Sequence, residues 1–334
     1  MPAIVALVLA ASMMHPGAGA AGPNRFEAVE PHMGTLVRLV VYAPDAGAAR
    51  AAFAAGFDRI RELEQILSDY RPDSEVSRLA AAPAGRPIHV SADLFAVLRV
   101  AQDVAAMTDG AFDVTQAPVT RLWREARASG RLPDSAALEA AAERSGFRKL
   151  SLDDEQRTVT TAVAGMGIDA GGIGKGYAAS AAVEAITGLG VHSALAAVSG
   201  DLAFSAAPPG QSGWRIAVST GDRSSAPDDH ALVLEHAAVS TSGASAQHLE
   251  VDDSRYSHII DPARGMGLRD DITVTVVAPT GAEADALATA VSVLGVERGL
   301  RVLDRRPGLS GLVVVRTGAD VRVYRSARYP GSAP

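Results

Sequence analysis

The order of helical and strand-like patterns constrains the fold of this chain more than any other feature. From residue 26 onward the two patterns mix without a long linker, and several strand-like segments follow one another directly, separated only by turn residues (193–206, 213–220, 230–243 and 271–279). A doubly wound sheet requires strict alternation of strands and helices, which is missing here. The sequence therefore predicts an α+β fold of mixed, mainly antiparallel sheets with packed helices, as a single large domain over residues 26–328.

Hydrophobic periodicity predicts the individual elements. Residues 35–43 are rich in β-branched side chains and predict a strand, and residues 157–163 and 165–169 predict strands that run into a glycine-rich motif. Amphipathic helices are expected over residues 46–67, 91–107, 133–144, 173–186 and 281–295. A hairpin is expected at residues 308–326.

Charge and cysteine content exclude several classes of function. The formal net charge is −7 and no cluster of Lys or Arg exceeds a pair, so duplex DNA or RNA is a poor candidate for a partner. The chain contains no cysteine, which excludes disulfides, thiolate nucleophiles, cysteine-ligated zinc and iron–sulfur clusters. Any metal ion must therefore be held by oxygen or histidine ligands.

The first residues resemble a targeting segment. An apolar run from Ala3 to Met14, followed by small residues, predicts a secretory signal over residues 1–21 with cleavage near Ala20 or Ala21. No Lys or Arg precedes the run, so a disordered leader or a misplaced start codon is the alternative. No later stretch approaches the ~20 apolar residues of a membrane span. Without a cysteine, attachment through a lipidated cysteine is excluded, and we expect a periplasmic or secreted protein.

The stretch "IDAGGIGKGYA" (168–178) indicates a site for an anion. It fails the P-loop template, because Asp169 stands where a glycine is needed and Gly176 stands where Ser or Thr should follow the lysine. A dinucleotide-binding pattern fits loosely but lacks its downstream acidic residue. A helix that begins near Gly172 would offer free N–H groups, a positive dipole end and Lys175 to a phosphate. Alternatively, the glycines only allow the helix to pack tightly against a strand.

Two segments further along the chain carry candidate ligands. Residues 255–268 predict a short strand with His258 and Ile260 on one face, although a structural histidine before a proline turn fits equally well. Asp285 and Thr289 lie four residues apart on one face of a predicted helix and could hold a hard cation such as Mg²⁺. The alternative is an exposed aspartate and a threonine bonded back to its own helix.

Aromatic residues beside turns are candidates for stacking on a planar ring. Phe112 follows a glycine turn and Asp113 would add a polar group, although a phenylalanine in the core is the commoner outcome. Tyr70 stands at the end of a predicted helix and could stack in the same way.

Taken together, these motifs occur in an order that resembles the ApbE-like FAD:protein FMN transferase family. The order is MGT (33–35), YRPDSEVSRL (70–79), GAFDVT (110–115), IDAGGIGKGYA (168–178), SGD (199–201), STSG (240–243), YSHIIDP (256–262) and ADALATA (284–290). Each motif is weak alone, but eight in sequence make the resemblance specific. It extends over nearly all of residues 26–324.

This resemblance implies an enzyme that uses Mg²⁺ to split the pyrophosphate of FAD. Its FMN half would pass to a Thr or Ser hydroxyl of an exported flavoprotein through a phosphoester bond, with release of AMP. By position, the implied FAD contacts are Met33, Tyr70, Ala111, Phe112, Asp113, Asp169, Lys175 and Ile260. The implied Mg²⁺ ligands are the carbonyl oxygen of Gly172 and the side chains of Asp285 and Thr289. His258 is the candidate base for the acceptor hydroxyl, and Asp261 is the second candidate.

The sequence departs from the family pattern at two points. Ser199 replaces the first glycine of the usual GGD, and the segment after residue 243 is shortened, which we expect to alter the lining of the site and the access of substrate. Two other functions remain open: a Mg²⁺-dependent FAD pyrophosphatase that yields FMN and AMP, and a non-catalytic flavin-binding protein. The binding protein would need neither Asp285 nor Thr289.

Overall fold

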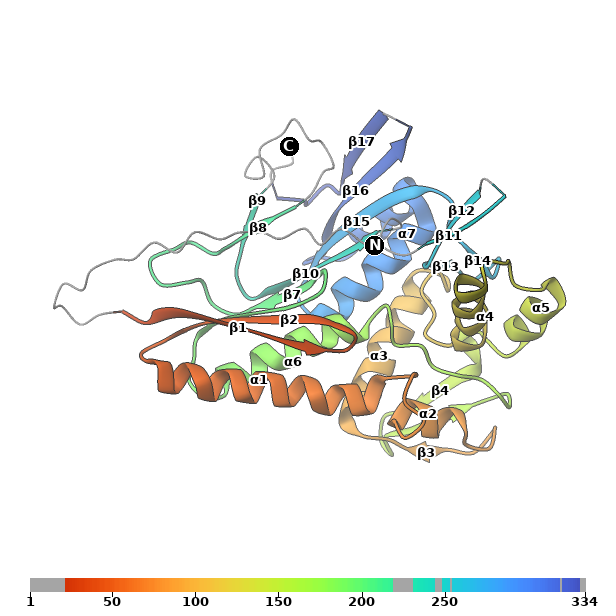
Figure 1. Cartoon of the computed structure of the whole chain (residues 1–334), viewed down its shortest axis with the longest axis horizontal. Coiled ribbons are helices and arrows are strands. Elements are labelled where there is room, and N and C mark those ends of the chain that lie inside the picture. Colours follow the sequence, from red (N-terminus) through yellow and green to blue (C-terminus); the bar gives the residue numbers. More distant parts are fainter. Residues whose placement is uncertain (1–21, 219–230, 244–247, 253, 319, 331–334) are drawn as a thin grey trace.

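The computed structural model describes residues 22–218, 231–243, 248–252, 254–318 and 320–330 (Figure 1). Its centre is an eight-stranded sheet in which every neighbouring pair of strands is antiparallel. In spatial order the strands are β1 (Asn24–His32), β2 (Thr35–Ala43), β6 (Ser193–Val198), β7 (Asp201–Phe204), β10 (Ala237–Gly243), β15 (Asp271–Ala278), β16 (Ser310–Thr317) and β17 (Asp320–Arg325). Strands from the N-terminal part of the chain thus form one side of the sheet and strands from the C-terminal part form the other, and the two sides join where β7 pairs with β10.

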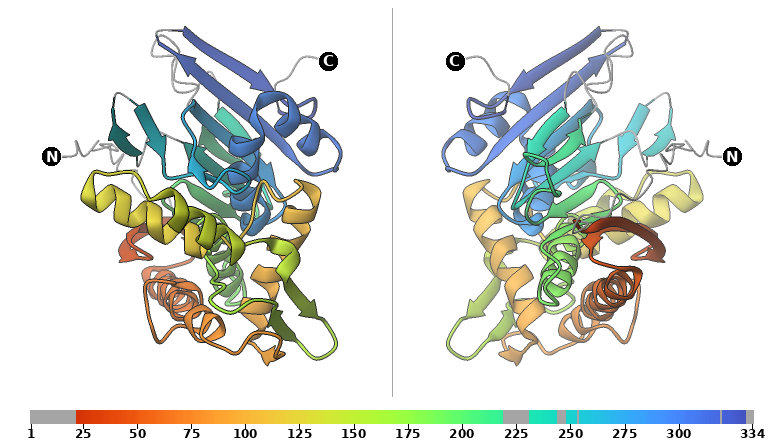
Figure 2. Two further views of the ribbon diagram at one scale, coloured as in Figure 1. Left: turned by 90° about the vertical axis from the view of Figure 1, so that its right-hand side faces the viewer. Right: turned by 90° about the vertical axis from the view of Figure 1, so that its left-hand side faces the viewer.

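Long helices cover one face of this sheet. Helix α1 (Ala46–Leu67) packs on β1 and β2, α6 (Gly174–Thr187) on β6 and β7, and α7 (Gly281–Asp304) on β10 and β15. Helix α3 (Ala92–Met107) packs against α1 and α7. Two further views show α1 beneath β1 and β2 and α6 beside α1, with β16 and β17 at the far end (Figure 2). The buried apolar side chains between helices and sheet form the main core.

Helix α1 illustrates why the sequence folds in this way. The side chain of Asp45 caps the first turn by accepting a hydrogen bond from the amide of Ala48 (2.9 Å). Apolar residues recur at helical spacing, and Phe57, Ile60 and Leu63 are buried against the sheet. This stripe fixes which face of α1 meets the core.

A smaller apolar cluster fills the opposite face of the sheet. The hairpin of β8 (Trp214–Ala217) and β9 (Ala231–Leu234) covers it, and Trp214, Ile216 and Leu232 pack there against Val40 and Phe204. This hairpin lies beside β1 and β2 on the side away from α1 (Figure 1). The sheet is therefore covered on both faces over part of its width.

The remaining elements surround one end of the sheet. They are α2 (Glu75–Ala80), α4 (Ala117–Ser129), α5 (Ser135–Glu143), a 3₁₀ turn (Phe147–Lys149), the small sheet of β3 (Ile88–His89), β5 (Thr158–Thr161) and β4 (Leu150–Asp153), and the hairpins β11 (His248–Val251) with β12 (Ser254–Ser257) and β13 (Ile260–Asp261) with β14 (Met266–Gly267). No described helix has both the length and the apolar character needed to cross a membrane. The candidate signal at residues 1–21 lies outside the described residues.

The α+β class with mainly antiparallel sheets is confirmed, but several local predictions were wrong. No strand runs into Asp169, because residues 165–169 make only one isolated bridge, between Gly167 and Gln116. His258 lies in the bend between β12 and β13 and not within a strand. Helix α7 continues to Asp304 beyond a kink at Gly295 (φ 73°), a backbone conformation that glycine adopts without strain.

Candidate active site

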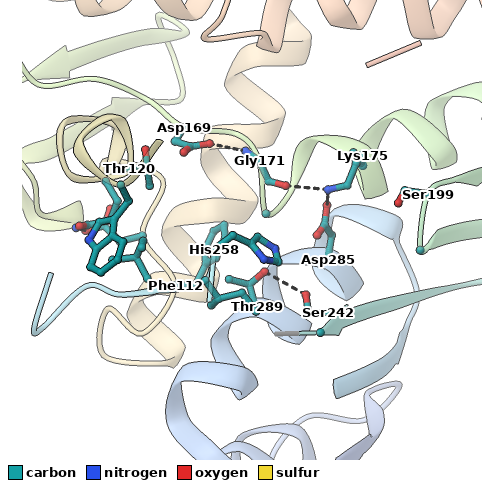
Figure 3. Close-up of a pocket in the computed structure, with 18 of the residues that line it drawn as sticks. Phe112, Thr120, Asp169, Gly171, Lys175, Ser199, Ser242, His258, Asp285 and Thr289 are labelled. Atoms are coloured by element: carbon teal, nitrogen blue, oxygen red, sulfur yellow. Dashed lines mark hydrogen bonds and ion pairs between the residues drawn. The ribbon is translucent and has the colours of Figure 1, made fainter. Parts of the chain in front are cut away.

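A cavity of about 440 Å³ opens where the N-terminal end of α6 meets α7, the end of β10 and the segments around residues 111–113 and 258–262 (Figure 3). Twelve of the thirteen site residues predicted from the sequence line it: Met33, Tyr70, Ala111, Phe112, Asp113, Asp169, Gly172, Lys175, His258, Ile260, Asp285 and Thr289. Asp261 is not among the lining residues. Its carboxylate accepts a hydrogen bond from the amide of Ala263 and lies 3.5 Å from Arg264 Nε, which is the arrangement of a local turn.

A charged cluster occupies one end of the cavity. Lys175 Nζ lies 3.5 Å from an oxygen of Asp201 and 3.8 Å from an oxygen of Asp285, and it donates a hydrogen bond to the carbonyl of Gly171 (2.8 Å). Both aspartates are buried. One lysine therefore faces two carboxylates, and the cluster carries an excess of one negative charge when all three groups are ionised.

The pKa values of these groups reflect that imbalance. Burial raises the pKa of Asp285 to about 7, with a further contribution from the charge of Asp201. Burial also raises the pKa of Asp201, which Lys175 and a hydrogen bond from Ser240 oppose. The charge of Asp285, with that of Asp201, raises the pKa of Lys175, so the lysine remains protonated. An additional cation beside Asp285 would stabilise its ionised form.

Oxygen atoms suited to such a cation line the same cavity as Asp285. Thr289 stands one turn further along α7, and its hydroxyl lies 3.5 Å from that of Ser242 on β10. A methyl group placed on Gly172 would lie 2.9 Å from the Thr289 hydroxyl, so the main chain of Gly172 runs directly beside it. The described residues hold no group of three or more His, Asp or Glu side chains that could bind a metal. A site here would combine one carboxylate with hydroxyl and carbonyl oxygens, which are the ligands that Mg²⁺ accepts.

The glycines of the motif have a packing role as well. A Cβ on Gly176 would come within 2.0 Å of the carbonyl oxygen of Gly281, so the backbones of α6 and α7 are in direct contact at this point. The amide of Gly176 also donates a hydrogen bond to Asp285 (3.2 Å). The glycines therefore do allow α6 to pack tightly, as the alternative interpretation of the motif predicted, but α6 packs here against α7 and not against a strand.

The other end of the cavity is built around Arg124 on α4. Its guanidinium pairs with Asp69 (2.5 Å) and with Asp169 (3.1 Å), and it lies over the ring of Tyr70, 4.3 Å from the ring centre. Burial and the neighbouring charge of Asp169 raise the pKa of Asp69. Arg124 thus fixes two carboxylates and covers one face of Tyr70, whose side chain is otherwise exposed.

Phe112 and Asp113 are held by their own surroundings. Phe112 is buried against Gly172. The carboxylate of Asp113 accepts hydrogen bonds from the amide and hydroxyl of Thr115, the side-chain amide of Gln116 and the amide of Phe147. Because both oxygens already have two donors, Asp113 shapes the cavity wall by fixing its neighbours.

The sequence did not identify several residues that line the cavity, among them Gln116, Trp123, Arg124, Asp201 and Ser242. Asp201 and Ser242 fall within the SGD and STSG motifs, which the sequence marked as part of the motif order without assigning a role to either residue. Arg124 and Trp123 lie on α4, a helix that was not predicted, and only the fold brings Arg124 beside Asp169.

The antiparallel sheet covered by long helices, with a cavity between the start of α6 and the carboxylate–hydroxyl face of α7, defines the class of α+β protein to which this chain belongs. Solved structures of this class include the apo form of the flavinyl transferase ApbE from Pseudomonas stutzeri, with a TM-score of 0.79 and 28% identity over 92% of this chain and 96% of that one. A histidine-to-glycine variant of the flavin transferase ApbE from Vibrio cholerae gives a TM-score of 0.80 and 26% identity, over 91% and 98%.

Sequence comparison leads to the same family. The FAD:protein FMN transferase of Treponema pallidum is 31% identical over 324 residues, which cover 92% of this chain and 89% of that protein. The model of the ApbE family matches residues 33–313. The chain belongs to the ApbE family. The family and the transferase class predicted from the sequence are thereby confirmed.

Proposed function

We propose that this protein transfers the FMN moiety of FAD to a Thr or Ser hydroxyl of an exported flavoprotein, forming a phosphoester bond and releasing AMP, with Mg²⁺ as the required metal. The observation that carries the proposal is the cluster of Lys175, Asp201 and Asp285, which lines the same cavity as Thr289. The activity named for the relatives supports it.

The metal assignment rests on charge and ligand chemistry. Asp285 is buried, its pKa is raised, and a single lysine does not balance it together with Asp201. We propose that Asp285, Thr289 and the carbonyl of Gly172 hold Mg²⁺, which as a Lewis acid would reduce the negative charge on the diphosphate. Mn²⁺ accepts the same oxygen ligands, so the residues alone do not select between the two ions.

Lys175 would act beside the metal by donating to the diphosphate. Its ammonium already lies among two carboxylates and a carbonyl, so its position is fixed before a ligand binds. A preorganised donor stabilises charge that develops in the transition state without the cost of reorganisation. Asp201, which accepts a hydrogen bond from Ser240 and pairs with Lys175, would hold the lysine in place.

The end of the cavity around Arg124 and Tyr70, which we call the ring-binding end, supports the proposal that the donor is FAD. Phe112 and Tyr70 supply aromatic surfaces, Ile260 and Met33 add apolar contact, and Asp169 offers a carboxylate fixed by Arg124. Such a mixture of aromatic walls with few polar groups is typical of cofactor sites. We propose that these residues, together with Ala111 and the wall around Asp113, bind the donor.

The transfer step requires a base for the acceptor. The hydroxyl oxygen attacks the phosphorus on the FMN side, the bond from that phosphorus to the oxygen of AMP breaks, and AMP departs with the electron pair. His258 lines the cavity between Phe112 and Asp285 in the close-up view (Figure 3). We propose that it accepts the hydroxyl proton, because imidazole has an ordinary pKa near neutral pH.

Export would bring the enzyme to its acceptor. The apolar run from Ala3 to Met14 motivates the proposal that residues 1–21 direct the chain to the periplasm or outside the cell. Edman sequencing of the exported protein would test it, with a mature N-terminus near Ala21 or Gly22 as the expected result.

Product analysis tests the proposed reaction. The protein is incubated with FAD and Mg²⁺, with and without an apo flavoprotein domain that carries a threonine acceptor, and with EDTA as the metal-free control. We expect flavin fluorescence on the acceptor in a denaturing gel and AMP only when metal and acceptor are present. Free FMN and AMP without labelled acceptor would identify a pyrophosphatase. FAD that stays intact in every tube would identify a binding protein.

A further inference from the structure

A second hollow, of about 510 Å³, lies on the face of the sheet away from α1 and α6. Val29 on β1, Leu36 and Arg38 on β2 and Leu195 on β6 contribute to its floor, and Trp214 on β8 forms a wall. We refer to this hollow as the β1–β2 groove. It is the part of the outer sheet face that the β8–β9 hairpin leaves uncovered.

The β1–β2 groove and the candidate active site share one residue. Ser199 lines both, and it is exposed in the two-residue turn between β6 and β7. In the close-up view Ser199 lies near Lys175 and Asp285, at the end of the cavity away from Thr120 and Asp169 (Figure 3). The groove therefore meets the cavity at the end where the diphosphate is proposed to bind.

The β1–β2 hairpin also connects the groove with the cavity, through the residues of its turn. Met33, in the turn of the hairpin, lines the cavity, whereas Val29 and Leu36 line the groove. A chain lying along the outer face of this hairpin would thus reach the cavity at the hairpin turn. Both routes lead from the groove into the cavity.

The chemistry of the groove indicates what it binds. Val29 is 48% exposed and Leu36 is 66% exposed, which is unusual for two apolar side chains that line the same hollow. Arg25 and Arg38 both lie near Glu27, at 2.6 Å and 3.4 Å, so two positive charges share one carboxylate. No acidic side chain is among the described residues that line the groove, although the whole chain has a net charge of −7. Apolar and acidic side chains would complement this surface.

We propose that the β1–β2 groove docks the acceptor flavoprotein through an extended segment with apolar and acidic side chains, which presents its Thr or Ser hydroxyl to the cavity past Ser199. This inference rests on the proposed function, since it names the surface that holds the acceptor of that reaction. Docking there brings the hydroxyl to the phosphate end and leaves the ring-binding end free for FAD.

The backbone at Ser199 fits this role. Ser199 has φ 61°, in the left-handed region that favours glycine. The serine hydroxyl consequently stands at the junction of groove and cavity in a conformation that its residue type does not favour. We assign Ser199 as a positioning residue for the acceptor segment. The variant Ser199→Gly should raise the KM for the acceptor by a larger factor than it changes kcat, whereas a merely structural serine would give an unchanged acceptor KM.

Matched charge insertions test the docking surface. Val29→Glu and Leu36→Glu place a carboxylate in the groove, and Val321→Glu makes the same change on β17, at the opposite edge of the sheet, where Val321 is 37% exposed. The probe is a fluorescently labelled apo flavoprotein domain that carries a threonine acceptor, and its binding is followed by anisotropy without FAD. We expect the Kd to rise at least tenfold for the two groove variants and to stay unchanged for Val321→Glu.

Turnover separates this inference from the proposed function. With FAD and Mg²⁺ present, we expect the groove variants to show a raised acceptor KM with an unchanged Kd for FAD. If Val29→Glu and Leu36→Glu bind and modify the acceptor as the parent protein does, the docking inference is wrong while the transferase proposal stands. If the parent protein binds the acceptor through the groove but never modifies it, the proposed function fails and the docking surface stands.

Discussion

The contact between α6 and α7 gives a sharp prediction, because two neighbouring glycines differ in the space around them. A Cβ on Gly176 would lie 2.0 Å from the carbonyl oxygen of Gly281 and 2.8 Å from the Cβ of Asp285. Ordinary contacts of this kind begin at 3.4 Å, so Gly176→Ala requires the two helices to separate by about 1.4 Å. The obstacle is main chain and cannot rotate away.

Overpacking a core costs about 1–3 kcal/mol, and the backbone contact at Gly176 predicts the upper end of that range. For a chain of this size, a loss of about 3 kcal/mol lowers the Tm by roughly 5 °C. The same shift displaces Asp285 and lengthens its hydrogen bond from the amide of Gly176. We therefore expect the affinity for Mg²⁺ to fall by about tenfold or more.

Gly174 provides the matched control. A Cβ there would have its nearest neighbours at 3.5, 3.6 and 3.9 Å, which are ordinary contacts. Gly174→Ala should leave Mg²⁺ binding unchanged and alter the free energy of unfolding by less than about 1 kcal/mol, in the stabilising direction. Urea denaturation and calorimetric Mg²⁺ titration of both variants measure the two effects. Equal stability and equal Mg²⁺ affinity for Gly176→Ala and Gly174→Ala would refute the close-packing argument.

Substitutions and pH changes at the site test the roles of Thr289, Arg124, Asp285 and His258. Thr289→Val should weaken Mg²⁺ binding about tenfold in calorimetry while Thr289→Ser retains it, and equal affinities would remove Thr289 from the ligand set. Arg124→Lys, which cannot bridge Asp69 and Asp169 as a planar fork does, should raise the Kd for FAD about tenfold in a fluorescence titration, and an unchanged Kd would contradict that role. The raised pKa of Asp285 (about 7) favours the protonated carboxyl in the folded protein, so the metal-free protein should lose stability as the pH rises from about 4 to 7. The apparent affinity for Mg²⁺ should increase over the same pH interval, because the metal binds the ionised carboxylate. An affinity for Mg²⁺ that does not change with pH would exclude Asp285 as the titrating ligand. His258→Ala should lower kcat by about 100-fold with little change in the Kd for FAD, and a loss of FAD affinity alone would make His258 a binding residue.

The sequence alone predicted those helices and strands that have a single, regularly spaced set of buried apolar residues. The strand at Thr35–Ala43 and the helix at Ala46–Leu67 have the predicted bounds, since one carries a run of β-branched residues and the other a clear cap and apolar stripe. Residues 193–206 were treated as one strand-like segment, whereas the chain turns at Ser199 and Gly200 to form β6 and β7. Residues 165–169 have strand-like composition but no partner to pair with along their length.

The site could be predicted only where a motif marked it. Asp285 and Thr289 were found because helical spacing alone places both on one face of α7. Lys175 was expected to face a phosphate as a free charge, but its ion pairs with Asp201 and Asp285 depend on β7 and α7 meeting α6, which no local pattern reveals. Arg124 likewise acquires its role from Asp69 and Asp169, which lie 55 and 45 residues away in sequence.

Intact-mass spectrometry of the acceptor shows whether this cavity moves FMN from FAD onto a protein hydroxyl. An apo flavoprotein domain is incubated with the enzyme, FAD and Mg²⁺, in parallel with the same domain whose acceptor threonine is replaced by valine. We expect a mass gain of one FMN less one water on the threonine form alone, with AMP released in equal amount. An unmodified acceptor accompanied by free FMN and AMP would contradict it, because water would then be the group that attacks the FMN phosphorus.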